Sequence, residues 1–190
     1  FCLSRGLGDV YKRQVVDARE KLRAAKPEDK MTVFAVLMRL REICCDPRLV
    51  ADNWTGSSAK LEACLELVTE AVAGGHRILL FSQFTSMLEL LAKRLDEAGV
   101  SHFTLQGSTP KPVRAEQVRR FNQGEADVFL ISLRAGGTGL NLTAADIVIH
   151  YDPWWNLAAQ NQATDRAYRI GQRNPVQVYR LIAQDTIEEK

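Results

Sequence analysis

Short apolar runs alternate with amphipathic stretches from residue 77 onward, and this alternation restricts the fold more than any other feature of the sequence. The runs RILLFS (77–82), DVFLIS (127–132) and DIVIHY (146–151) have the length and composition of strands buried on both faces. Amphipathic helices are expected between them, at 85–98 and 112–122. Strand–helix alternation with turn residues between the elements predicts parallel βαβ units and an α/β sandwich.

Helices dominate the part of the chain before the first strand. Apolar residues recur there at three- and four-residue steps, and Ser58 is a suitable N-cap for an amphipathic helix that closes at Gly74 and Gly75. The remaining elements are expected as helices at 15–26, 31–45, 58–75 and 157–168 and as strands at 101–105 and 176–182.

The domain organisation follows from this order of elements. At 190 residues the chain accommodates one domain with a substantial core. We expect a helical lead-in over 15–57, followed by an α/β lobe over 58–190 that is truncated at its C-terminal end. Residues 1–14 have no clear periodicity and resemble adapter-derived peptides, so we expect them to be artefactual and assign them no function.

Charge and cysteine use narrow the classes of protein. The net charge of +2 does not by itself identify a nucleic-acid partner, although arginines gather from Arg114 onward and arginine suits phosphate. The four cysteines lack C-x-x-C spacing and a matching histidine pair, so we expect buried reduced thiols and no metal site. No apolar run reaches transmembrane length and no signal peptide is evident, so we expect a soluble cytoplasmic protein without a membrane partner.

Polar motifs follow two of the predicted strands, at the sheet edge where open α/β sheets bind ligands. In LQGSTP, Gly107 permits close approach of the backbone, and Ser108 and Thr109 offer hydroxyl groups to a phosphate. A simple turn explains the same residues equally well. In FSQF, polar side chains can face a ligand, or Ser82 or Thr85 can act as a helix N-cap.

The motif RAGGTG is the strongest backbone signal in the chain. The adjacent glycines Gly136 and Gly137 free backbone amides to approach an anion, and Thr138 adds a hydroxyl group. A dinucleotide-binding fingerprint is excluded, because Leu142 occupies the place of the third glycine and no acidic residue follows at the required distance.

Two further motifs point to stacking and to anion binding. Trp154 and Trp155 of DPWWN cannot both point inward from an extended chain, so one can be core and the other an exposed stacking surface. Ordinary core packing is the alternative. In QATDRAYRIGQ, Arg166 and Arg169 lie three residues apart, on one face of a helix, where their forked donors suit a triphosphate. A solvated basic helix face is the alternative for these arginines.

The motifs SLRAGGTGLNL, DPWWN, QATDRAYRIGQ and VQVYRLIAQDTIEEK, in this order and spacing, strongly resemble the C-terminal lobe of the bacterial Swi/Snf family. Its members are superfamily-two DNA translocases similar to DEAD/DEAH-box helicases. The resemblance runs from about 31 to 190. It implies a three-layer, RecA-like (P-loop NTPase-like) α/β fold, in which helices flank a parallel sheet, with an N-terminal helical lead-in.

The resemblance also implies roles for individual residues. Arg166 and Arg169 would be catalytic arginine fingers. The ATP-binding residues would be Gly139, Asn141 and Gln162. Contacts with the DNA backbone would come from Gln106, Gly107, Ser108, Arg134, Gly136, Gly137, Thr138 and Trp155.

The motifs that are missing restrict the expected function to half of an ATPase site. The chain has no G-x-x-x-x-G-K-[ST] loop and no strand-borne Asp-Glu pair for magnesium. In the resembling family both belong to the first lobe, so ATP with Mg²⁺ would be bound mainly by the N-terminal RecA-like lobe of the same polypeptide. We expect a DNA-dependent ATPase in the intact protein and an inactive isolated fragment.

The expected function is therefore that of the second motor lobe of an ATP-dependent translocase or remodeller on double-stranded DNA. A nucleoid-associated location follows from that expectation, and RNA polymerase and repair factors are open as further partners. The alternatives are a non-catalytic DNA- or protein-binding module and a lobe of a strand-separating superfamily-two helicase.

Overall fold

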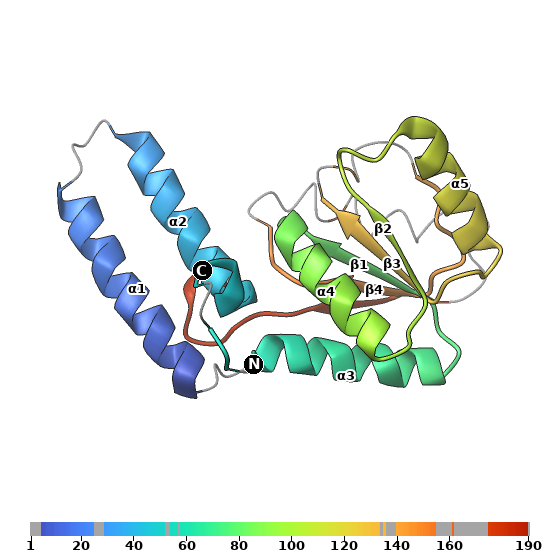
Figure 1. The fold of residues 1–190 in the computed structure, drawn as a ribbon, viewed down its shortest axis with the longest axis horizontal. Coiled ribbons are helices and arrows are strands. Elements are labelled where there is room, and N and C mark those ends of the chain that lie inside the picture. Colours follow the sequence, from blue (N-terminus) through green and yellow to red (C-terminus); the bar gives the residue numbers. More distant parts are fainter. Residues whose placement is uncertain are drawn as a thin grey trace. The chain divides into compact units, whose positions relative to one another are not determined.

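The computed structural model describes residues 5–24, 29–51, 54–56, 58–133, 135, 140–154, 161 and 175–189. The chain forms two compact units, one of Phe1–Glu62 with Ile182–Lys190 and the other of Ala63–Leu181 (Figure 1). The helices are α1 (Arg5–Ala24), α2 (Lys30–Cys45), α3 (Ala59–Ala73), α4 (Thr85–Glu97) and α5 (Lys111–Asn122), with short 3₁₀ helices η1 (Pro47–Leu49) and η3 (Ile187–Glu189). The strands are β1 (Ile78–Ser82), β2 (His102–Leu105), β3 (Val128–Ser132), β4 (Ile147–His150) and β5 (Gln177–Arg180).

The second unit is built on a five-stranded sheet in the order β2-β3-β1-β4-β5, and every pairing in it is parallel. Each strand of this sheet lies at a position expected from the sequence, so the predicted α/β fold is confirmed. The three inner strands, β3, β1 and β4, are buried along their whole length, as continuous apolar runs require. The edge strand β5 is mostly exposed.

Helices cover both faces of this sheet. The crossovers β1–α4–β2 and β2–α5–β3 run in opposite directions along the strand order, and right-handed crossovers of opposite direction place their helices on opposite faces. On one face, Phe121 of α5 joins a cluster with Phe81 and Phe129. In Figure 1, α4 lies in front of the sheet, and its buried residues are not members of that cluster. The result is the expected three-layer arrangement.

Side-chain bonds also join neighbouring elements at the amino ends of the strands. The hydroxyl of Ser101 donates to Asp127, with 2.6 Å between Oγ and Oδ2. Asp146, just before β4, lies 2.8 Å from the ring of His76 and accepts from the backbone N–H of Arg77, just before β1. These bonds lie at the edge of the sheet opposite to the predicted ligand edge.

The first unit contains the hairpin of α1 and α2. Val36 and Leu40 of α2 pack with Ala18 of α1, and Tyr11 and Ile187 pack against this group. The helix expected from residue 15 begins ten residues earlier, at Arg5, and the hydroxyl of Tyr11 accepts a hydrogen bond from the backbone N–H of Ile187. No helix in the described part of the chain is long and apolar enough to cross a membrane.

A buried ion pair joins distant parts of the sequence within the first unit. The ammonium Nζ of Lys60 lies 2.8 and 2.7 Å from the two carboxylate oxygens of Glu188, and both side chains are essentially inaccessible to solvent. Glu188 also accepts a hydrogen bond from the backbone N–H of Ala183. The segment after β5 is thereby fixed to the start of α3, where Ser58 caps the helix as expected.

Candidate functional site

The carboxyl ends of the parallel strands form the edge of the sheet at which the predicted motifs converge. Gln106 follows β2, Leu133 follows β3, Gln83 follows β1, and Tyr151 follows β4. Since all the strands run in the same direction, these positions lie along one edge, where open α/β sheets bind ligands.

The segment after β2 forms a tight turn. The backbone N–H of Gln106 donates to the hydroxyl of Thr109 at 3.0 Å, and the N–H of Thr109 donates to the carbonyl of Gln106 at the same distance. Gly107 and Ser108 are exposed at its tip. A methyl group added at Gly107 would meet nothing within 4 Å, so the fold does not need a glycine there and leaves room for a ligand. The turn and the ligand surface are therefore compatible interpretations.

Arg114 brings a positive charge to this part of the edge. It lies in the first turns of α5, directly after the turn at Gln106, and its Nη1 donates to the carbonyl of Ala135 at 3.5 Å. Ala135 in turn donates its backbone N–H to the hydroxyl of Ser132, at the end of β3. The guanidinium group thus connects the helix after β2 with the segment after β3.

A carboxylate joins the ends of β1 and β4. The hydroxyl of Ser82 donates to Oδ1 of Asp152 at 2.5 Å, and the backbone N–H of Gln83 lies 3.3 and 3.2 Å from the two oxygens of Asp152. Ser82 also accepts from the N–H of Phe84 at 3.2 Å. Both Ser82 and Asp152 are buried, at 0% and 1% relative exposure.

The structure corrects the expected role of the FSQF motif in capping. Phe84 occupies the N-cap position of α4 and makes no side-chain cap bond, so neither Ser82 nor Thr85 caps this helix. Sequence reasoning also missed Asp152, although an acidic residue two positions beyond a buried strand is a signal that could have identified it.

His150 is a buried neutral base at the end of β4. Its ring stacks on that of Phe81, with 5.6 Å between centroids and 21° between planes. Burial and, to a lesser extent, the charge of Arg180 on the neighbouring strand lower the pKa of His150 to about 4. The imidazole is therefore uncharged at neutral pH and adds no positive charge to this edge.

The last turn of α5 holds Asn141 away from the carboxyl ends of the strands. The side-chain amide of Asn122 donates to the carbonyl of Asn141 at 2.8 Å, and its oxygen accepts from the N–H of Ala144 at 3.3 Å. This end of α5 returns the chain to the amino side of the sheet, ahead of β3. The structure therefore does not bring Asn141 together with the turn at Gln106.

Trp154 is partly buried and packs against the core cluster that includes Phe81 and Phe129. This position agrees with the expectation that one of the two adjacent tryptophans is a core residue. The other predicted site residues lie outside the described part of the chain: Arg134, Gly136, Gly137, Thr138, Gly139, Trp155, Gln162, Arg166 and Arg169.

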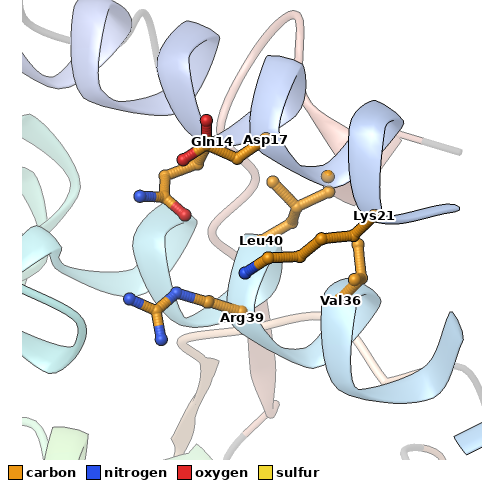
Figure 2. Close-up of a pocket in the computed structure, with 7 residues that line it drawn as sticks. Gln14, Asp17, Lys21, Val36, Arg39 and Leu40 are labelled. Carbon is orange, nitrogen blue, oxygen red and sulfur yellow. The ribbon is translucent and has the colours of Figure 1, made fainter. Parts of the chain in front are cut away.

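A shallow pocket lies in the first unit, between α1 and α2 (Figure 2). Its wall includes the apolar side chains of Val36 and Leu40 and the charged groups of Asp17, Lys21 and Arg39. None of the predicted site residues lines it. The described residues contain no group of three or more His, Cys, Asp or Glu side chains that could hold a metal ion.

Comparison with known proteins identifies the relatives of this chain. The family model of the helicase conserved C-terminal domain matches residues 59–171. The putative ATP-dependent helicase/translocase YwqA of Bacillus subtilis is 40% identical over an aligned length of 195 residues, and the alignment covers 99% of this chain and 21% of that protein. An uncharacterized ATP-dependent helicase of Mycoplasma pneumoniae is 38% identical over 182 residues, 95% of this chain and 18% of that protein. The chain thus spans about a fifth of the length of these relatives.

Solved structures include a similar fold. The SWI2/SNF2 ATPase core of Sulfolobus solfataricus in complex with dsDNA is 28% identical, with a TM-score of 0.83, over 99% of this chain and 41% of that chain. The expected RecA-like architecture is thereby confirmed.

Proposed function

This chain belongs to the helicase conserved C-terminal domain family, in its SWI/SNF group, and we propose that it is the second motor lobe of an ATP-dependent translocase on double-stranded DNA. The observation that carries the proposal is the likeness over 99% of the chain to a SWI2/SNF2 core solved in complex with dsDNA. The first lobe of the same polypeptide would supply the other half of the ATPase site.

The DNA-facing part of the proposed site is the edge beyond β2 and β3. The exposed tip at Gly107 and Ser108 has room for a phosphate, and the hydroxyl group of Ser108 can bind it. Arg114 adds a positive charge nearby. We assign backbone contacts to this tip and to Gln106, and, from the resemblance, to Arg134, Gly136, Gly137, Thr138 and Trp155. Because phosphate contacts dominate such a surface, binding should depend strongly on salt and little on sequence.

The nucleotide-facing part rests on the arginine motif. Arg166 and Arg169 would stabilise the negative charge that develops on the transferred phosphoryl group, as arginine fingers do in other nucleotidases. Gly139, Asn141 and Gln162 are the proposed ATP contacts of this lobe, and the first lobe would hold most of the nucleotide with its Mg²⁺. The two lobes would close on ATP and open after hydrolysis. This cycle would move the DNA-backbone contacts of each lobe along one strand of the DNA.

Replacing either arginine in the intact polypeptide tests the proposal. Arg166→Ala and Arg169→Ala should lower DNA-stimulated ATP turnover by roughly 10³-fold or more, because the charge on the phosphoryl group loses its partner. DNA affinity, measured by fluorescence anisotropy, should stay near that of the wild-type protein. Arg119→Ala is the matched control, since Arg119 is an exposed arginine paired with Glu116 on the surface of α5.

Three outcomes distinguish the alternatives. Normal turnover in both arginine variants would contradict the arginine-finger role. DNA binding by a wild-type protein that shows no DNA-stimulated hydrolysis would favour the non-catalytic module. Separation of strands on a forked duplex would favour the strand-separating helicase.

A further inference from the structure

We propose that Asp152 is a positioning residue, which through its hydrogen bond with Ser82 fixes residues 151–154, the segment directly before the proposed DNA contact Trp155. The inference rests on the proposed function, because it concerns how the DNA-binding edge is held in place. Its evidence lies within the described residues of the second unit.

The carboxylate continues the pairing of β1 and β4 beyond the point where their backbone bonds end. Phe81 and His150 are register partners, and the N–H of Tyr151 donates to the carbonyl of Phe81 at 2.9 Å. One residue later, the side chain of Asp152 replaces the backbone as acceptor and binds the hydroxyl of Ser82 and the N–H of Gln83. The two departing loops are thereby joined although they lie 70 residues apart in sequence.

A strand of this sheet can end without such a carboxylate. Ser132 is the register partner of Ser82 on β3, is also buried, and also accepts a backbone N–H from its own turn, that of Ala135. Within the described residues, Ser132 makes no bond to a carboxylate of a neighbouring strand. A buried carboxylate carries a desolvation cost, so the acid at Asp152 calls for a reason beyond ending a strand.

The residues directly after Asp152 supply that reason. Pro153 has a fixed φ angle, and Trp154 packs on the core cluster. Asp152 is therefore held by its hydrogen bonds, Pro153 by its ring and Trp154 by its packing on the core. These three residues directly precede Trp155, the proposed DNA contact. A DNA-binding loop that starts from a fixed segment binds better than one that starts from a mobile segment, because less ordering is needed on binding.

The intact polypeptide tests this role through the DNA concentration that gives half-maximal ATPase stimulation. This concentration does not depend on how much of the protein is active, whereas the maximal rate does. Ser82→Ala removes the hydroxyl donor and should raise the half-maximal concentration by roughly three- to tenfold, which is the effect of losing up to about one charge-assisted hydrogen bond. Asp152→Asn should act in the same direction, because it replaces the charged acceptor of the Ser82 hydroxyl with a neutral amide and so weakens that bond.

A double variant and a control separate positioning from general damage. Ser82→Ala combined with Asp152→Asn should raise the half-maximal concentration by less than the product of the single effects, because both changes act on the same Ser82–Asp152 bond. Ser101→Ala removes a similar serine–aspartate bond at the amino ends of the strands and should leave the concentration unchanged.

Two results would overturn the inference. A half-maximal DNA concentration within twofold of wild type in both single variants, with only the melting temperature or maximal rate lowered, would leave Asp152 a purely structural residue. A wild-type protein whose ATPase activity does not respond to DNA would overturn the proposed function and this inference with it.

Discussion

The buried pair of Lys60 and Glu188 provides a quantitative test of how the first unit is held together. The two side chains are 1% and 0% exposed, and the ammonium group contacts both carboxylate oxygens. Lys60→Met removes the charge and keeps most of the length and volume. It leaves a buried carboxylate that still accepts from the N–H of Ala183 but has lost its cation, and breaking a buried pair in this way costs about 3–5 kcal/mol.

Urea unfolding followed by circular dichroism measures this loss. With a slope of about 2 kcal/mol per molar urea, the midpoint should fall by roughly 1.5–2.5 M. Lys60→Met combined with Glu188→Gln should regain a large part of the loss, because the uncompensated charge is gone and the amide oxygen can still accept from Ala183. The backbone amides of residues 183–189 should exchange hydrogen fastest in Lys60→Met, more slowly in the double variant and most slowly in the wild-type protein.

An exposed ion pair of similar length is the matched control. The side-chain atoms of Arg119 and Glu116 are 2.6 Å apart but more than half exposed, so Arg119→Met should leave the urea midpoint close to that of wild type. The reasoning would be refuted by a Lys60→Met protein whose free energy of unfolding lies within about 1 kcal/mol of wild type, because so small a loss is typical of surface ion pairs. A double variant that is no more stable than Lys60→Met alone would refute it as well.

Two further predictions concern titratable groups. The pKa of His150 is about 4 in the folded protein and about 6.5 in the unfolded chain. Between these pH values the unfolded chain binds a proton that the folded protein does not. The free energy of unfolding therefore falls as the pH drops through this window, by up to about 3 kcal/mol. Urea midpoints at pH 7.5, 6 and 5 should show this fall, and His150→Phe should make it shallower; equal slopes in the two proteins would contradict the assignment. Burial, followed by the nearby charge of Glu188, raises the pKa of Cys44 to about 12, so iodoacetamide should leave Cys44 unmodified in the folded protein at pH 8.5 and alkylate it in urea, as read by peptide mass spectrometry. Rapid native alkylation of Cys44 would show that this thiol is accessible and ionised in the folded protein, contrary to its burial.

Local sequence patterns were sufficient for the elements of the sheet. Each buried strand is a short apolar run between turn residues, and β1 and β3 each begin within one residue of the expected position. Neighbours in sequence determine such patterns, so they can be read without tertiary information. The start of α1 was missed, because the amphipathic pattern of that helix is not apparent before Val15.

The features that sequence reasoning could not supply depend on contacts between distant residues. The pairing of Lys60 with Glu188 spans 128 residues, and that of Ser82 with Asp152 spans 70. The position of Asn141 is set by the amide of Asn122, which is an ordinary helix-end residue when read locally. Spacing indicates which residue types could form a site, whereas such long-range bonds decide which of them meet.

The strand order has a consequence for the synthesis of this protein on the ribosome. β1 lies at the centre of the sheet, yet both strands that pair with it, β3 and β4, come later in the chain. At least two helices and another strand lie between β1 and either of them. The segment ILLFS therefore leaves the ribosome long before any strand can pair with it. An apolar segment with high β-propensity that waits in this way is prone to aggregate and is a target for chaperones. Nascent chains that stop before β3 should consequently depend on chaperones more than the finished domain does.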